Sequence, residues 1–574
     1  MLRLGLALIA ALALSGSSAL APAAGAQERR TELLRISFPS EDGSLTPYTF
    51  TNGYALVMLM YDSLTWRDAD GVPQPWLAQS VRRNGRTVTV RLRRGARWHD
   101  GRPLTAADVV FTYRYMARRT HPRFTLQLRD IASVRQRGAR TVVFQLRRPS
   151  LGFEDQPLAD VPILPRHLWE NLADGRRAPA GLPVGSGPYR LTGHHVGRSY
   201  TFESTPQYFK GRPLVDLLEV SIVPKEEDAF KALKRTASSG RIDVVPANLP
   251  AGAFRDRDRG IRYDESVSYN GTMLAFNLHR PPFNRLAARR AVARALDLEK
   301  IGGATSGPGA MAPAQRGAVH PQSEWAPERD LATSDPEGAQ IAFLEQGFRP
   351  FTVLASDADG VRLEAAKRVV EQLRRAGARA QLLEVSPEDF QRALGRGGRT
   401  ALFEAAVVAL PVNASYDPSY LRTVFGPPEE AALNDMGYRS ARFDRLDERV
   451  SAASTEGARK RAVDAELRQV AEDLPAVPLF FGGTTFAYRR FGYAGWLGVR
   501  GVGLLDKRSF LRGPRTAAAS APAAADPRDT VSETGGQSLV PVIIAVAALM
   551  LLGLAFVTTR NRRASTRARD SRRR

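Results

Sequence analysis

The residue types that could carry out catalysis do not combine into a catalytic motif. His99 and Asp100 look like a fragment of a Ser/His/Asp triad, but they begin an ordinary Asp-Gly turn. Ser186 lies between two glycines and lacks the upstream glycine of a G-x-S-x-G nucleophile elbow. The adjacent His194 and His195 belong to no H-E-x-x-H motif and read as a surface loop pair. No glycine-rich phosphate loop occurs either. We therefore expect no enzymatic activity, no cofactor and no metal.

Alternating strand and helix patterns surround these residues. The segment 87–92 alternates apolar and polar side chains, as a half-buried strand does, and 141–146 and 218–223 read as further strands. Thr105 and Asp108 have the spacing of a capping box, so a helix is expected to begin there. A second helix is expected over 361–376, followed by a strand over 380–385 and a helix start at Ser386. This order predicts an α/β fold.

The carboxyl end has the pattern of a membrane-spanning helix. Ser538 to Thr559 forms 22 residues without a charge, which is long enough to cross the hydrocarbon core of a bilayer. The tail 560–574 carries eight arginines against the single Asp570, and such flanks stay on the cytoplasmic side. We expect one transmembrane helix over 538–559 with the preceding chain outside the cell membrane. A buried core helix is the alternative.

The amino end and the segment before the apolar stretch agree with this topology. Residues 1–26 combine Arg3, an apolar run and a small-residue site at 24–26, as a secretory signal peptide does. Residues 512–537 are rich in Ala, Pro, Ser and Gly and read as a flexible linker. The chain has no cysteine, so neither a disulfide nor a lipid-modified cysteine is expected.

The chain is strongly basic, with a formal net charge of +23. The tail contributes +7 and Arg3 +1, which leaves +15 for the remainder. The arginines are scattered and no aromatic-plus-basic cluster resembles a nucleic-acid module, so we expect no nucleic-acid partner. Anionic lipid headgroups would still attract this charge.

Several segments resemble one protein family. They are Tyr61-Asp62-Ser63-Leu64, the run from Arg91 to Phe111 (RLRRGARWHDGRPLTAADVVF), Pro183 to Leu191 (PVGSGPYRL), Ala275 to Leu278 with Pro281 to Asn284, Arg289 to Val292, and Leu474 to Leu479. In this order they resemble the family 5 extracellular solute-binding proteins, the oligopeptide-, dipeptide- and nickel-binding receptors of ABC importers. The resemblance covers about residues 32–510.

The resemblance implies a two-lobed periplasmic-binding-protein-like ectodomain of the type II, large three-domain variety, to which the apolar carboxyl end adds one C-terminal transmembrane helix. Within the ectodomain it implies lobe I (27–57, 184–270 and 482–511), an extra subdomain (58–183) and lobe II (271–481). The residues themselves predict the signal peptide (1–26), the linker (512–537), the transmembrane helix (538–559) and the cytoplasmic tail (560–574). The lobes are expected to close on a ligand about a hinge.

Peptide-binding relatives hold the ligand's amino terminus with an aspartate three residues before an acidic-Pro pair. Here that pair resembles Asp417-Pro418, and Ala414 occupies the third position before it. An ammonium group without an anion would be costly to bury, so an amine-anchored peptide is in question. The expected ligand contacts are Tyr48 as an aromatic wall, Tyr269, Asn270 and Asn277 near the crossing between the lobes, and Asn413, Tyr416 and Asp417 in the acidic-Pro segment.

The combined features predict a membrane-anchored substrate-binding protein of an ABC importer. It would capture a peptide or similar small solute at the outer face of the bacterial cytoplasmic membrane and deliver it to separate permease subunits. One alternative is a receptor for a non-peptide solute such as a metal chelate, a haem-like ring or a glycoside. Another is an anchored sensor or scaffold that signals through a membrane partner.

Overall fold

The computed structural model describes residues 30–50, 53–119, 121, 123–172, 177–246, 260–304, 312–395, 401–410, 417–431, 433–499 and 503–511. All of them belong to one compact unit that extends to Pro514, and residues 515–574 form a separate unit. The predicted signal peptide, linker, transmembrane helix and tail lie outside the described residues. Within the described residues, no helix has the length and apolar character needed to cross a bilayer.

A mixed sheet of eleven strands forms the centre of the described part. Its order is β15-β14-β16-β12-β17-β11-β1-β10-β9-β8, with β13 added alongside β17. The strands are β1 (Thr31–Phe38), β8 (Tyr189–His195), β9 (Ser199–Ser204), β10 (Val215–Ile222), β11 (Val244–Pro246), β12 (Ile261–Phe276), β13 (Ala312–Pro313), β14 (Phe351–Ser356), β15 (Ala380–Val385), β16 (Ala405–Leu410) and β17 (Ala476–Arg489).

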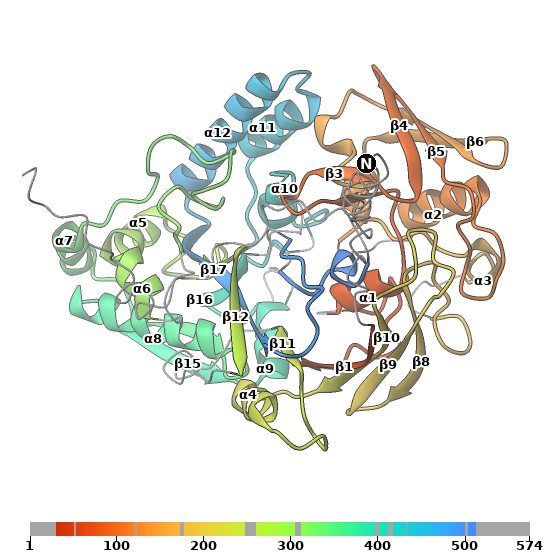
Figure 1. Cartoon of the computed structure of the whole chain (residues 1–574). Coiled ribbons are helices and arrows are strands. Elements are labelled where there is room, and N and C mark those ends of the chain that lie inside the picture. Colours follow the sequence, from red (N-terminus) through yellow and green to blue (C-terminus); the bar gives the residue numbers. More distant parts are fainter. Residues whose placement is uncertain are drawn as a thin grey trace, which may run out of the picture. The chain divides into compact units, whose positions relative to one another are not determined.

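Two long antiparallel strands, β12 and β17, connect the two ends of this sheet (Figure 1). Their first paired stretch, which begins at Ile261, lies beside β11, and their second, which begins at Gly271, lies beside β16. The pairing register shifts between Val267 and Gly271. We call β1, β8–β11 and the adjoining parts of β12 and β17 the β1 body, together with their helices. The β14 body comprises β14–β16 and the other parts of β12 and β17, again with their helices.

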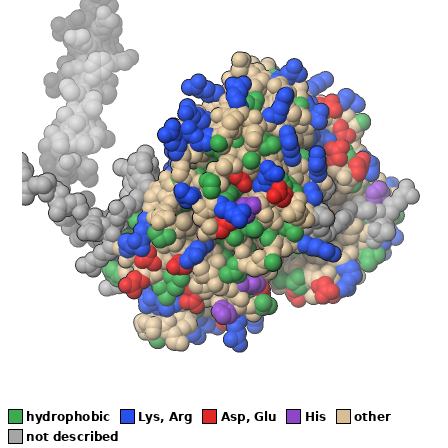
Figure 2. Space-filling view, turned by 90° about the vertical axis from the view of Figure 1, so that its right-hand side faces the viewer, with side chains coloured by type: hydrophobic (Ala, Val, Ile, Leu, Met, Phe, Trp, Pro, Cys, Tyr) green, Lys and Arg blue, Asp and Glu red, His purple; other side chains and the backbone are tan. Residues whose placement is uncertain are grey.

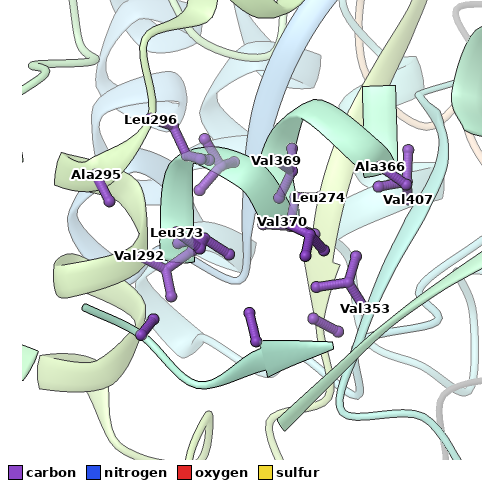
Figure 3. Packing of buried hydrophobic residues seen from close by; sticks show 14 of the residues in the cluster. Leu274, Val292, Ala295, Leu296, Val353, Ala366, Val369, Val370, Leu373 and Val407 are labelled. Atoms are coloured by element: carbon purple, nitrogen blue, oxygen red, sulfur yellow. The ribbon is translucent and has the colours of Figure 1, made fainter. Parts of the chain in front are cut away.

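Helices cover both faces of the sheet in the β14 body. They are α5 (Leu286–Ala295), α6 (Leu298–Ala304), α7 (Pro336–Gln346) and α8 (Gly360–Arg375) on one face, and α9 (Pro387–Leu394), α10 (Tyr420–Phe425), α11 (Ala441–Ala452) and α12 (Glu456–Asp473) on the other. Val353 and Val407 point to the first face and pack with Val369 of α8 (Figure 3). Their neighbours Leu354 and Val408 point to the other face. Burial on both faces explains why these strands read as continuous apolar runs.

The β1 body is smaller in helical content. Its helices are α1 (Tyr54–Met60) and α4 (Glu226–Lys234), and a short 3-10 turn, η4 (Lys507–Phe510), returns the chain to it. The loop with Gly185 and Gly187 packs against the end of α1. A Cβ atom on these glycines would lie 1.9 Å from the Met60 carbonyl oxygen and 2.3 Å from that of Leu59. The glycines are therefore required by close backbone packing.

A separate antiparallel sheet, the four-stranded layer, has the order β4-β5-β7-β6. Its elements are β4 (Ala78–Asn84), β5 (Thr87–Leu92), β6 (Ile131–Arg137), β7 (Thr141–Leu146) and the covering helix α2 (Ala106–Arg118), with β2 (Thr65–Arg67), β3 (Pro73–Pro75), η1 (Thr125–Leu128), η2 (Leu151–Phe153) and α3 (Arg166–Trp169) nearby. The Asp108 carboxylate accepts a hydrogen bond from the Thr105 backbone N–H at 2.8 Å. The predicted capping box is therefore present at the start of α2.

Candidate ligand-binding site

The crossing of β12 and β17 holds two of the predicted contact residues. Tyr269 and Asn270 lie within the register shift between Val267 and Gly271. The side chain of Asn270 is exposed, whereas that of Tyr269 is not among those described. Extended strands interrupted by a bulge can change twist locally. The ligand roles of both residues remain predictions.

Asn277 lies at the far end of β12, away from the register shift. Its side chain is 1% exposed. The amide nitrogen donates to the Phe403 carbonyl at 3.0 Å, and the amide oxygen accepts from the His279 N–H, also at 3.0 Å. These bonds fix the segment that leads into β16. The buried amide holds backbone inside the β14 body, and the predicted ligand contact of Asn277 stays a prediction.

Tyr48 packs against the four-stranded layer and its flanking segments. Its ring lies 5.9 Å from the Tyr115 ring, 5.3 Å from His121 and 5.9 Å from Trp169. Its hydroxyl donates to the Arg119 carbonyl at 3.4 Å. Edge-to-face packing of this kind stabilises an aromatic cluster. Tyr48 remains half-buried, and its predicted role as an aromatic wall stays a prediction.

Asp417 is the described member of the acidic-Pro segment, since Asn413, Ala414 and Tyr416 lie outside the described residues. Both carboxylate oxygens pair with the guanidinium of Arg459 from α12, each at 2.7 Å. One oxygen also accepts from the Ser419 backbone N–H at 3.0 Å. Burial by itself would raise the pKa of Asp417, but Arg459 and the hydrogen bonds outweigh it and hold the pKa below the ordinary value.

The four-stranded layer's flanking turn η2 contacts the β14 body at this ion pair. A Cβ atom on Gly152 would lie 2.3 Å from Oδ2 of Asp417 and 3.1 Å from Nη2 of Arg459. Gly152 does not have a left-handed backbone conformation. The absent side chain is therefore needed for close approach rather than for the turn itself.

A second contact between the same two parts is electrostatic. Arg129, which follows η1, donates to Oδ2 of Asp447 at 2.8 Å and to Oγ of Ser451 at 2.7 Å, both on α11. Arg422 of α10 donates to the same Asp447 oxygen at 2.7 Å. Asp447 is thereby shared between an arginine of its own body and one from the layer side. A hydrogen bond between charged groups contributes about 1.5–3 kcal/mol.

Glu466 of α12 lies beneath these charges and is 1% exposed. Burial, followed by the negative charge of Asp447, raises its pKa well above the ordinary value despite the nearby arginines. One of its carboxyl oxygens is buried without a hydrogen-bond partner in the described part of the chain. Burial and the Asp447 charge thus both favour the protonated form of Glu466.

Residues 72–428, more than half of the chain, match the model of the family described as bacterial extracellular solute-binding proteins, family 5, middle region. The chain belongs to this family. The relatives include protein XP55 of Streptomyces lividans, 32% identical over 247 residues, which cover 42% of this chain and 43% of XP55. The oligopeptide-binding protein AppA of Bacillus subtilis is 24% identical over 460 residues, 74% of this chain and 81% of AppA. The chain thus spans less than half of XP55 but most of AppA.

Solved structures have the same fold as this family 5 protein. AppA of Bacillus subtilis in complex with a nonapeptide superposes with a TM-score of 0.73 at 22% identity, covering 85% of this chain and all of AppA. NikZ from Campylobacter jejuni in complex with Ni(L-His) superposes with a TM-score of 0.70 at 20% identity, covering 80% of this chain and 94% of NikZ. At these identities the likeness establishes the α/β periplasmic-binding-protein-like fold.

The sequence analysis missed Arg129, Gly152, Asp447 and Arg459 of this family 5 protein. One of them, Asp447, carried a detectable signal. Asp447 comes four residues after Phe443 and three before Val450, so its carboxylate lies on the same helix face as these apolar side chains. A charge in such a position requires a buried partner. Gly152 and Arg129 carried no such signal, because their partners are about 300 residues away along the chain.

The histidines singled out in the sequence have structural partners. One ring nitrogen of His99 lies 3.0 Å from the Gly187 carbonyl, and burial lowers its pKa to about 4. His194 and His195 end strand β8 rather than forming a loop, which corrects the expectation. Nε2 of His194 lies 2.5 Å from Oε1 of Glu41. In the described part of the chain, no three His, Cys, Asp or Glu side chains are placed to hold a metal ion.

Proposed function

We propose that this family 5 protein is the membrane-anchored substrate-binding protein of an ABC importer. The β1 body with 27–57, 184–270 and 482–511 would be lobe I, residues 271–481 lobe II, and residues 58–183 the extra subdomain. The apolar segment 538–559 would hold the lobes at the outer face of the cytoplasmic membrane. The receptor would capture a peptide or similar solute by lobe closure and release it to the permease subunits.

The crossing of β12 and β17 is the observation that carries this proposal. Two paired strands join the bodies, and their register shifts where they pass from one to the other. Motion at such a crossing changes the separation of the bodies without breaking either core. The relatives support a solute as the cargo, since AppA was solved with a nonapeptide and NikZ with a nickel–histidine complex.

One observation favours a solute without a peptide's free amine as the second candidate. By the family resemblance, Ala414 would occupy the position where peptide-binding relatives have the anchoring aspartate. The nearby carboxylate of Asp417 cannot replace it without losing Arg459, because both oxygens are already paired. Removing one partner of a buried ion pair costs about 3–5 kcal/mol. A metal chelate, a haem-like ring or a glycoside would need no such anion.

Native mass spectrometry of residues 27–511 tests the proposal directly. A series of added masses that fit short peptides would support the peptide receptor, and one discrete non-peptide mass would support the second candidate. A bare protein whose melting temperature is unchanged by peptide pools and by nickel–histidine would contradict solute binding. A sensor or scaffold that co-purifies with a kinase instead of permease subunits would then be the better description.

A pair of asparagine variants places the site. Asn270→Ala, at the exposed crossing, is expected to weaken binding of the identified solute at least tenfold without lowering the melting temperature. Asn284→Ala removes an equally exposed amide after β12 and serves as the matched control. Equal affinities of the two variants would show that the crossing does not contact the solute.

A further inference from the structure

The outer face of the four-stranded layer carries arginines and no acidic residue. Across the sheet, Arg91 lies in register with Thr141, which pairs with Arg137. Arg82 of β4 lies in register with Thr89 of β5. Thr89 pairs with Val143 of β7, which in turn pairs with Arg135 of β6. The opposite face holds the apolar side chains that pack under α2. None of the four strands contains Asp or Glu.

The four outer arginines are exposed and unpaired. Within the described residues, no hydrogen bond or ion pair engages the guanidinium of Arg82, Arg91, Arg135 or Arg137. Helix α8 shows the usual alternative, where Arg375 pairs with Glu371 at 2.6 Å. Like charges held on one rigid surface repel each other, and a multivalent anion relieves that repulsion. The layer therefore presents a preformed cationic face.

The spacing of this arginine face suits a surface of phosphates. Neighbouring strands are about 4.8 Å apart, so Arg91 and Arg137 lie on backbones about 10 Å apart. Arg82 and Arg135, with two strands between them, lie on backbones about 14 Å apart. Each guanidinium can bind phosphate oxygens in a bidentate manner. The face has no aromatic side chain on which a nucleic-acid base could stack, which argues against single-stranded nucleic acid.

Charged side chains on the layer's side of the molecule are mostly basic. Figure 2 shows this side, and Lys and Arg side chains gather over its upper part, the level at which Figure 1 shows β4, β5 and β6. Acidic side chains in the neighbouring segments are already engaged. Asp130 pairs with Arg148 at 3.0 Å, and Glu154 lies 3.4 Å from Arg83. These pairs leave the outer arginines without a local counter-charge.

Leu511, the last described residue, lies in a small apolar cluster near the start of β4. Leu511 packs with Trp66 and Trp76, and Trp76 lies two residues before the first residue of β4. The predicted linker 512–537 then leads to the predicted transmembrane helix. A flexible chain of this length has a root-mean-square span of about 30 Å.

We propose that the arginine face binds anionic phospholipid headgroups and thereby orients the receptor on the membrane. The proposal rests on the membrane anchor of the proposed function, because the anchor supplies the high local concentration of lipid. A sheet face whose four arginines have no partner among the described residues matches an anionic surface in charge. With the layer against the bilayer, the β1 body is fixed while the β14 body remains free to move at the crossing.

Binding to lipid vesicles tests the proposal on residues 27–511. This fragment contains every described residue and all six apolar clusters of the compact unit, and its cooperative unfolding is checked first. Sedimentation is measured with phosphatidylcholine vesicles, with and without phosphatidylglycerol. The test variant is R91Q/R135Q/R137Q. The control is R290Q/R294Q/K367Q, which removes the same charge from exposed positions on α5 and α8.

The wild type and the control are expected to bind phosphatidylglycerol vesicles, and the test variant about a hundredfold more weakly. Added inorganic phosphate is expected to compete no better than chloride of the same ionic strength. Equal binding by test and control variants would overturn the proposal, as would no preference for phosphatidylglycerol or displacement by phosphate. Because the fragment lacks residues 512–574, these outcomes are independent of whether the anchor exists, which is tested separately by membrane fractionation of the full chain.

Discussion

Replacing Gly152 with alanine is expected to push η2 away from the β14 body. The new Cβ atom would lie 2.3 Å from Oδ2 of Asp417, whereas ordinary van der Waals contact begins at 3.4 Å. Asp417 cannot easily move aside, because Arg459 and the Ser419 N–H hold it. The overlap of about 1 Å is relieved at lower cost by separating the two surfaces. The variant is therefore expected to separate η2 from the β14 body while the Asp417–Arg459 ion pair stays intact.

The magnitude follows from overpacking a tight contact. Inserting one methyl group into a well-packed site costs about 1–3 kcal/mol. If the whole cost falls on the contact between the layer side and the β14 body, the equilibrium between contact and separation shifts by a factor of about 5–150. Backbone strain adds nothing, because Gly152 does not occupy the left-handed region. The thermal unfolding of each core is expected to be unchanged.

The distance between the two parts is measured with a pair of labels. The chain has no cysteine, so Gln136→Cys on β6 and Arg445→Cys on α11 give two defined positions. Both side chains are exposed. Gly152→Ala is expected to move the distance distribution to longer values. The matched control is Gly498→Ala, where no atom lies within 4 Å of the added Cβ, and its distribution should equal that of the wild type.

Two results would refute this reasoning about Gly152. An unchanged distance with unchanged melting temperature would mean that the contact at Asp417 is looser in solution than in the structure. An unchanged distance with a lowered melting temperature would mean that the Asp417–Arg459 pair yields instead of the contact. In either case η2 would not limit the approach of the two parts.

Three further predictions concern buried charges. A double-mutant cycle with Arg129→Gln and Asp447→Asn should give a coupling energy of about 1–3 kcal/mol, measured from denaturant unfolding. Glu466→Gln should reduce the loss of stability as the pH rises above about 4.5, because the raised pKa makes the folded protein keep a proton that the unfolded chain releases. Lys507→Met should destabilise the protein by about 3–5 kcal/mol in calorimetry, because it leaves the carboxylate of Asp62, 2.9 Å away, buried without its cation.

Exposed residues provide the controls for these three variants. Lys231→Met removes a surface ion pair with Asp228 and should change stability by less than about 1 kcal/mol. Glu448→Gln makes the same substitution on the exposed side of α11 and is the matched control for Glu466→Gln. The first prediction is contradicted by a coupling energy near zero in the double-mutant cycle. The second is contradicted if the Glu466 variant keeps the wild-type pH dependence of stability. The third is contradicted if Lys507→Met destabilises the protein no more than Lys231→Met does.

Local patterns in the sequence predicted individual elements well. The strands 87–92, 141–146 and 380–385 have the predicted bounds, and the helix predicted over 361–376 is α8, Gly360–Arg375. The helix starts at Thr105 and Ser386 are also confirmed. These features depend on side-chain periodicity and on caps within four residues, so neighbouring residues alone decide them. The α/β fold class followed from their order.

The candidate site was only partly predictable from the residues. Tyr269 and Asn270 were placed at the crossing, and the structure has them in the register shift of β12. Asn277 was expected beside them, but its amide is used by the backbone around Phe403. The sequence does not indicate which side-chain amides will form hydrogen bonds with backbone groups, because the two partners of such a bond can lie more than 120 residues apart, as Asn277 and Phe403 do.

By itself the sequence determined the α/β class, the resemblance to family 5, the absence of thiol chemistry and the basic charge. Only the tertiary structure decided how that charge is used. It pairs Arg129 with Asp447 and Arg459 with Asp417, and within the part of the chain that is described it leaves the outer arginines of the four-stranded layer without partners. The physical reason is that ion pairing depends on distances of a few ångströms between side chains that chain topology brings together, whereas composition records only that the charges exist.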